Sequence, residues 1–117
     1  MENLKQKVEF DGKIVYEVDD SRYSIDSRRE NDKYIAWYEL GLIDKGWGPN
    51  QYDHIIKVYN KKIGTIKTAF SITDKRVGTH YTLYLREITG DILKLTVTPD
   101  SDEEFKKKEI NLENLFA

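Results

Sequence analysis

Two neighbouring residues, Asp53 and His54, have side chains of the types that do acid–base chemistry. An imidazole oriented by a carboxylate can act as a general base if a nucleophile lies within reach. The surrounding sequence YDHIIKVYN alternates as a strand does, and adjacent strand residues point to opposite faces of a sheet. Asp53 therefore cannot orient His54, and no nucleophile can be assigned. We expect a strand histidine that is hydrogen-bonded to a neighbour.

A second histidine, His80, opens another alternating segment and would approach His54 only if the strand order allows it. Metal sites read from sequence need spacings such as H-x-x-x-H or clustered acids, which this chain lacks. Its glycines match no phosphate-binding motif. We therefore predict no catalytic residue, no metal and no cofactor, and we keep four candidates for a polar site: Asp53, His54, Arg76 and His80.

Trp47 lies between two glycines and is followed by Pro49. Such a loop could present the indole as an anchor for a binding partner, a role that tryptophan often takes at interfaces. The alternative is that the indole folds back as a lid over the open end of the sheet. Further aromatic residues are close in the sequence, and the candidates for partner binding are Trp47, Pro49, Tyr52, Trp37 and Tyr38.

Length and composition exclude several classes of protein. A chain of 117 residues predicts a single domain, residues 1–117, that can fold without cross-links. The absence of cysteine excludes a disulfide scaffold, a thiolate zinc site and a cysteine nucleophile. No apolar run suits a signal peptide or a membrane span, so we expect a cytoplasmic protein. The net charge of −2 makes direct binding to nucleic acid unfavourable.

Alternating apolar and polar residues predict an antiparallel meander after residue 52. Its strands are expected at residues 53–60, 64–72, 79–89 and 92–99, with Ile66, Thr68, Phe70 and Ile72 on one face of the second strand. Threonine, tyrosine, isoleucine and valine are frequent there, as is typical of strands.

Another hairpin is predicted in the sequence KVEFDGKIVYEV near the N-terminus. A two-residue turn at Asp11 and Gly12 would pair Glu9 with Ile14. A three-residue loop would instead pair Glu9 with Lys13 and Val8 with Ile14, which matches opposite charges and places apolar residues on the same face. We therefore expect the three-residue loop.

The remaining segments are less regular. Residues 19–33 are mostly charged or hydroxylic and indicate a long loop, with RYSI as a candidate edge strand. Residues 31–43 fit a helix or a strand, because apolar residues occur on every face. Capping residues, acids and then lysines predict a C-terminal helix from about residue 101. The fold class is therefore α+β: mainly an antiparallel β-sheet of five or more strands, with one or two short helices.

The segment from Trp47 to Gly78 resembles a group of short phage-encoded accessory proteins of undetermined role. In that group a tryptophan precedes an Asp-His strand start, followed by a basic turn and a second strand that ends in Phe-Ser before a glycine. The chain departs from the group at Ile55, where an aromatic residue is common, and in continuing with two more strands instead of a helical part. The resemblance implies a phage or mobile-element origin.

Together these features favour a non-enzymatic binding protein. We expect a phage or mobile-element accessory protein that inhibits a host protein such as a defence nuclease, in the manner of an anti-CRISPR protein. The alternatives are a nucleotide or small-molecule sequestering protein, in which aromatic rings stack a base and Arg76 meets phosphate, and a toxin immunity protein. The partner would be a host protein, and homo-oligomerisation is compatible with the same features.

Overall fold

The computed structural model describes residues 6–18, 20–44, 50–75, 79–100 and 104–117. These residues form strands and one short helix, in the order β1 (Gln6–Phe10), β2 (Lys13–Val18), β3 (Tyr23–Glu30), β4 (Tyr34–Asp44), β5 (Gln51–Asn60), β6 (Thr65–Thr73), β7 (Tyr81–Thr89), β8 (Ile92–Pro99), β9 (Lys106–Asn111) and α1 (Leu112–Leu115). The prediction of a mainly antiparallel β fold with a short C-terminal helix is confirmed, and so are the four strands expected between residues 53 and 99. Within these ranges no helix has the length and hydropathy needed to cross a membrane.

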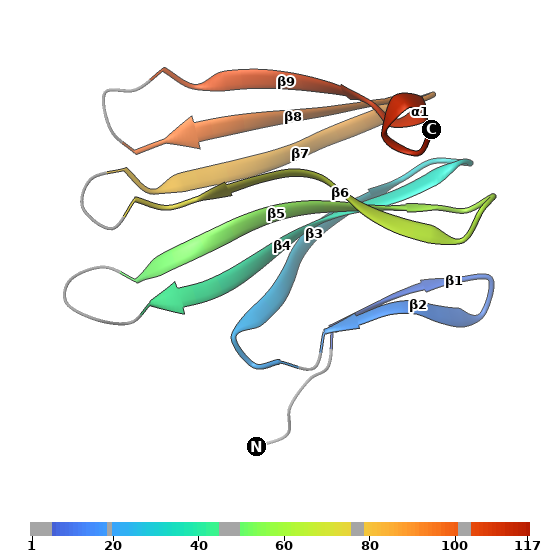
Figure 1. Ribbon diagram of the computed structural model, residues 1–117, viewed down its shortest axis with the longest axis horizontal. Coiled ribbons are helices and arrows are strands. Elements are labelled where there is room, and N and C mark those ends of the chain that lie inside the picture. The colour runs from blue at the N-terminus through green and yellow to red at the C-terminus, as the bar shows by residue number, and fades with distance from the viewer. Residues whose placement is uncertain (1–5, 19, 45–49, 76–78, 101–103) are drawn as a thin grey trace.

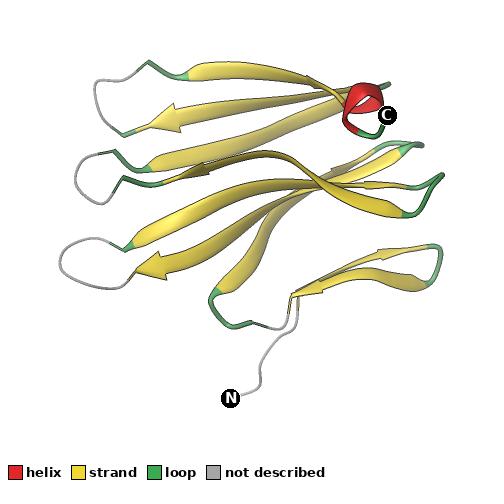
Figure 2. Ribbon diagram, in the orientation of Figure 1, coloured by secondary structure: helices red, strands yellow, loops and turns green. Residues whose placement is uncertain are grey.

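The strands form three stacked layers (Figures 1 and 2). The middle layer is the four-stranded sheet β3-β4-β5-β6, and the sheet β7-β8-β9 covers one of its faces. The hairpin β1-β2 covers part of the other face. The expected meander is therefore interrupted, because β6 and β7 belong to different sheets.

Strand β4 is buried on both faces. Tyr34, Ala36 and Tyr38 face the sheet β7-β8-β9, whereas Ile35 and Trp37 face the hairpin β1-β2. A strand in the middle of three layers needs apolar residues on both sides, as strands covered on both faces do. Of the segment 31–43, for which a helix and a strand were both open, residues 34–43 are strand and residues 31–33 are a turn before it. Burial on both faces explains why the pattern of apolar residues did not distinguish a strand from a helix.

Bulges change which face a side chain occupies. In β6, Phe70 pairs with Ile56 and Thr68 with Lys57, so Ala69 is an extra residue. Phe70 and Ile72 consequently pack between the two large sheets, while Ile66, before the bulge, packs with the hairpin β1-β2. The prediction that Ile66 shares a face with Phe70 and Ile72 is wrong, because one extra residue reverses the alternation.

The N-terminal hairpin has the turn that we did not expect. Asp11 and Gly12 form a two-residue turn with φ of 56° and 75°, and Glu9 pairs with Ile14. Both turn residues adopt the left-handed conformation, which twists the strands in the sense that hairpins favour and which aspartate and glycine tolerate. The extra residue Val15 then shifts the register and places apolar side chains opposite one another, as Val8 and Tyr16 are. The three-residue loop was therefore wrong.

Two further expectations need correction. Residues 23–30 form the edge strand β3 rather than a long loop. The predicted C-terminal helix begins only at Leu112, because residues 106–111 pair with β8 as strand β9; residues 101–103 lie outside the described part. Pairing with β8 and burial of Ile110 against the core override the helical propensity of a lysine-rich segment.

Candidate functional site

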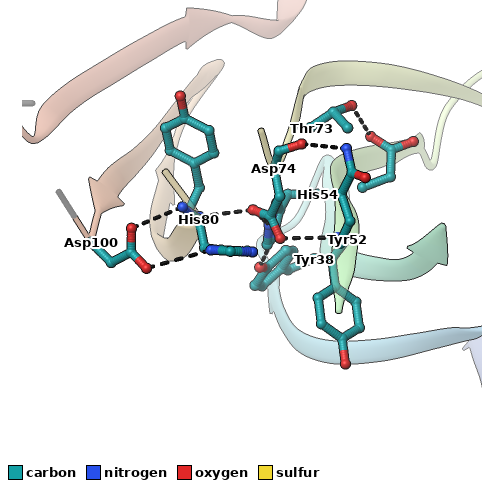
Figure 3. A network of polar contacts seen from close by, with 10 residues as sticks. Tyr38, Tyr52, His54, Thr73, Asp74, His80 and Asp100 are labelled. Atoms are coloured by element: carbon teal, nitrogen blue, oxygen red, sulfur yellow. Dashed lines mark hydrogen bonds and ion pairs between the residues drawn. The ribbon is translucent and has the colours of Figure 1, made fainter. Parts of the chain in front are cut away.

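A chain of buried polar groups lies at the end of the middle sheet where β4 and β6 end and β5 begins (Figure 3). His54 Nε2 is 2.7 Å from Asp74 Oδ1, and His54 Nδ1 is 2.5 Å from the Tyr38 hydroxyl. Each of the three residues is at most 4% exposed. Figure 3 shows Asp74 between His54 and the backbone of neighbouring strands.

The phenol can donate a hydrogen bond within this chain. Burial raises the pKa of Tyr38 to about 12, so at neutral pH the hydroxyl keeps its proton and can donate it to His54 Nδ1. In the tautomer that carries its proton on Nε2, His54 then donates to Asp74.

The Asp74 carboxyl group also accepts two backbone hydrogen bonds. The Tyr52 N–H donates to Oδ2 over 3.0 Å, and the Tyr81 N–H donates to Oδ1 over 2.8 Å. With the bond from His54, three donors satisfy this buried carboxylate, as a charge away from water requires. The three donors come from β5 and β7, so the carboxylate joins the two large sheets.

The position of Asp74 depends on the register between β5 and β6. The bulge at Ala69 places Asp53 opposite Thr73 and His54 opposite Ile72. Asp74 is the residue after Thr73 and lies two positions beyond Ile72. Its side chain is therefore on the same face as His54 and diagonal to it. Asp53 is on the other face, as predicted, where its carboxylate accepts a hydrogen bond from the Thr73 hydroxyl over 2.9 Å.

This geometry limits what His54 can do chemically. Both ring nitrogens are engaged, one by Tyr38 and one by Asp74, so neither is free to take a proton from a substrate. The Tyr38 phenol is a poor nucleophile at neutral pH, because burial holds its pKa at about 12. The hydrogen bonds of Tyr38, His54 and Asp74 therefore hold the strands together. The same three side chains form one wall of a cavity.

That wall bounds an open cavity of about 490 Å³. The cavity receives side chains from the bulge of β3, from β4, from the beginnings of β5 and β7, and from the segments beside them. Its lining residues are Asp26, Tyr38, Leu40, Asn50, Tyr52, His54, Asp74, His80, Tyr81 and Thr82.

The second histidine lies in the same cavity, so the structure brings His80 and His54 together. His80 Nδ1 is 3.6 Å from Asp100 Oδ2, and the backbone N–H of His80 donates to Asp100 Oδ1 over 2.9 Å. In the described part of the chain, no group of three or more acidic or histidine side chains is arranged to hold a metal ion.

The other candidates fall into three groups. Trp37 and Tyr38 are buried, at 0% and 4% exposure; Trp37 packs in the core under the hairpin β1-β2, whereas Tyr38 lies at the inner side of the cavity. Tyr52 is half-buried at the cavity. Trp47, Pro49 and Arg76 lie outside the described residues.

A second buried polar cluster holds the hairpin β1-β2 against the middle sheet. Glu39, only 3% exposed, accepts a hydrogen bond from the Tyr16 hydroxyl over 2.6 Å and another from Trp37 Nε1 over 3.4 Å. Lys57 donates to the Tyr16 hydroxyl over 2.8 Å. Burial, together with Glu39, raises the pKa of Tyr16 far above its ordinary value. The cluster neutralises a buried carboxylate and anchors Tyr16 over the Trp37 ring, at a centroid distance of 4.9 Å.

Sequence reasoning missed Asp74 and Asp26. A register for the hairpin β5-β6 that included the bulge would have placed Asp74 beside His54, but nothing in the sequence marks Ala69 as the extra residue. Asp26 is itself a bulged residue, between Ile25 and Ser27, in a segment that we expected to be a loop. Comparisons with protein-family models, curated proteins and solved structures returned no match.

Proposed function

We propose that the protein is a non-enzymatic binding protein that inhibits a host protein by occupying its surface, as an accessory protein of a phage or mobile element would inhibit a defence nuclease. The observation that carries the proposal is the open cavity, with half-buried tyrosines at its opening and a hydrogen-bonded wall behind them. This arrangement suits recognition of a partner's side chain.

The wall is organised before a partner arrives. Asp74 is held by three donors, and Tyr38 and His54 are fixed in turn by the same chain of hydrogen bonds. Binding sites whose side chains are locked by packing and hydrogen bonds lose little conformational entropy on association. Tyr52 and Tyr81 add large, rigid side chains of the type that dominates binding energy at interfaces.

The engagement of both His54 nitrogens supports binding rather than catalysis. A general base needs a free nitrogen within hydrogen-bond reach of the proton that it removes. Here the imidazole would first have to break a buried hydrogen bond to Tyr38 or to Asp74. The same residues are better explained as the support of a docking surface.

Affinity capture tests the proposal. The tagged protein and its Tyr52→Ala variant would be incubated with a lysate of candidate host cells, and retained proteins would be identified by mass spectrometry. The captured protein would then be purified and its affinity and activity measured directly. Truncating an interface tyrosine commonly costs about 2 kcal/mol, so we expect Tyr52→Ala to weaken binding at least about tenfold. We also expect the purified partner to lose activity when the wild-type protein binds it.

The matched control is Tyr84→Ala, because Tyr84 is 54% exposed on β7 and does not line the cavity. Circular dichroism would verify that both variants are folded. Equal binding by wild type and Tyr52→Ala, or a partner that stays fully active when bound, would overturn the proposal.

The size of the cavity favours one alternative, sequestration of a small molecule. About 490 Å³ lies within the roughly 300–1,000 Å³ range of small-molecule sites. None of the described lining residues is lysine or arginine, which disfavours a nucleotide, because its phosphates need cationic partners. Mass spectrometry of small molecules released from the purified, heat-denatured protein would distinguish sequestration from protein binding.

A further inference from the structure

We propose that the cavity binds a positively charged organic group, and that the partner presents an arginine or lysine side chain to it. The inference rests on the proposed function, since it assigns the chemistry of the group that enters the cavity. Three features carry it: the charges of the described lining residues, the hydrogen bonds that already occupy the buried carboxylate, and the aromatic side chains of the lining.

Two carboxylates with different environments line the cavity. Asp74 is buried, with 2% exposure, whereas Asp26 is exposed on the bulge of β3. No lysine or arginine is among the described lining residues. Burial is the main cause of the raised pKa of Tyr38, and the nearby carboxylates of Asp26 and Asp74 raise it further. Both carboxylates therefore lie close enough to the cavity to interact with a charged group inside it.

Carboxylates outnumber fixed cations among the described residues around the cavity. The Asp74 oxygens accept hydrogen bonds from the backbone N–H groups of Tyr52 and Tyr81 and contact His54 Nε2, and no lysine or arginine is among the described lining residues. His80, the second histidine of the lining, is directed to Asp100, a third carboxylate. The described lining residues therefore favour a cation over an anion.

The aromatic lining favours an organic cation over a simple ion. Tyr38, Tyr52 and Tyr81 line the cavity together with the two histidines. Aromatic rings attract guanidinium and ammonium groups through their quadrupole, while the apolar part of an arginine or lysine side chain packs against them. Asp26 at the exposed side can pair directly with the charged head, since the oxygens of Asp74 already accept three hydrogen bonds.

The opposite end of the molecule provides a contrast. A cavity of about 600 Å³ lies there, but lysines and acids line it together: Asp32, Lys33, Lys61, Lys62, Asp91 and Glu113. Mixed charges give that cavity no preference for one sign. Its residues therefore supply the control in the experiment below.

The test is an NMR titration of the full-length ¹⁵N-labelled protein with three probes. The first is the capped tripeptide Gly-Arg-Gly, the second is the same tripeptide with citrulline, a neutral isostere of arginine, and the third is agmatine, a small-molecule dication with a guanidinium and a primary amine. We expect the arginine peptide to shift the backbone amide signals of Tyr52, Tyr81 and Thr82 saturably, and the citrulline peptide to bind at least about tenfold more weakly.

Two variants test whether binding of the arginine peptide depends on the Asp26 carboxylate. Asp26→Asn should weaken binding of the arginine peptide about threefold to fivefold, as loss of an exposed ion pair does, while Asp32→Asn should leave it unchanged. Equal shifts by the arginine and citrulline peptides, or equal binding by wild type and Asp26→Asn, would overturn the inference. Binding of agmatine at least about tenfold tighter than that of the peptide would overturn the assignment to a protein side chain and indicate a free small-molecule cation.

The two proposals can fail separately. If partner binding depends on Tyr52 but the arginine and citrulline peptides behave alike, the cation site is wrong and the proposed function stands. If the peptides differ as expected but Tyr52→Ala binds the captured partner normally, the proposed function is wrong and the cation site stands.

Discussion

Asp74 is the residue on which the buried network converges. Its two oxygens accept hydrogen bonds from the His54 ring and from the N–H groups of Tyr52 and Tyr81. Only a carboxylate offers enough acceptor positions for three donors without placing a donor of its own among them. The carboxyl group is therefore part of the architecture as well as of the cavity.

Replacing Asp74 by asparagine tests this role. The amide has one acceptor oxygen and would turn its NH₂ group toward at least one buried donor, so we expect a loss of about 2 to 4 kcal/mol in the free energy of unfolding. Urea denaturation followed by circular dichroism measures it. The matched control is Asp53→Asn, because Asp53 accepts its hydrogen bond from the Thr73 side chain at the surface. A similar loss for both variants would contradict the role assigned to Asp74.

The individual residues show how far sequence reasoning reached. It correctly placed the side chains of Asp53 and His54 on opposite faces of the sheet, because adjacent residues of a strand alternate between the faces. It could not find Asp74 or Tyr38 as the partners of His54, since both contacts depend on register and on the packing of strands from different parts of the sequence. Trp37, proposed for an interface, is buried by the hairpin β1-β2, whose docking no local pattern indicates.

At the level of elements, alternation located most strands but not the faces of their side chains. The strands between residues 53 and 99 were predicted because each alternates over several residues. Bulges at Ala69 and Arg86 then reverse the alternation within β6 and β7. A bulge is stabilised by the core that it fits, so it leaves no signal that can be recognised before the packing is known.

One contact between elements predicts a coupled pair of mutations. Gly41 of β4 pairs with Tyr23 of β3, and a Cβ added at Gly41 would lie 2.5 Å from Tyr23 Cε2. The tyrosine ring thus covers the glycine, an arrangement that compensates for a glycine inside a strand. We expect Gly41→Ala to cost about 1 to 3 kcal/mol, because the ring must move.

In a Tyr23→Ala background the clash is absent, and alanine suits a strand better than glycine does. Gly41→Ala should then be nearly neutral, which gives a coupling of about 1 kcal/mol or more in a double-mutant cycle. Urea denaturation of the four proteins provides the cycle. An equal cost of Gly41→Ala in both backgrounds would show that the ring does not restrict this position.

At the level of the whole molecule, three buried or half-buried phenols join the layers. Tyr16 connects the hairpin β1-β2 to Glu39, Tyr34 donates to Asp91 over 2.7 Å, and Tyr38 belongs to the network around His54. Burial raises the pKa of Tyr34 and of Tyr38 to about 12. The layers therefore depend on phenols that keep their protons.

Stability should consequently fall in alkali. An unfolded tyrosine loses its proton near its ordinary pKa of 10.0, whereas Tyr34 and Tyr38 keep theirs in the folded chain up to about pH 12. Between these values the unfolded state binds fewer protons, so the free energy of unfolding decreases as the pH rises. Between pH 9 and pH 11 each of the two phenols should account for a loss of about 1.3 kcal/mol.

Urea denaturation at pH 9 and at pH 11 measures this decrease. The double variant Tyr34→Phe/Tyr38→Phe is less stable at pH 9 because it lacks two hydrogen bonds, yet it should lose less stability between the two pH values than the wild type. If wild type and variant lose the same amount, other groups cause the alkaline transition.

The network around His54 takes its members from segments that are distant in the sequence: Tyr38 from β4, His54 from β5, Asp74 after β6, and the N–H of Tyr81 from β7. No single hairpin contains them, and the two large sheets must dock before the last hydrogen bond closes. Docking of distant segments follows hairpin formation, because it must close longer loops. A chain in which only one of the two large sheets has formed therefore lacks this cavity. A molecule that bound in the cavity would consequently distinguish the completed fold from a partly folded chain.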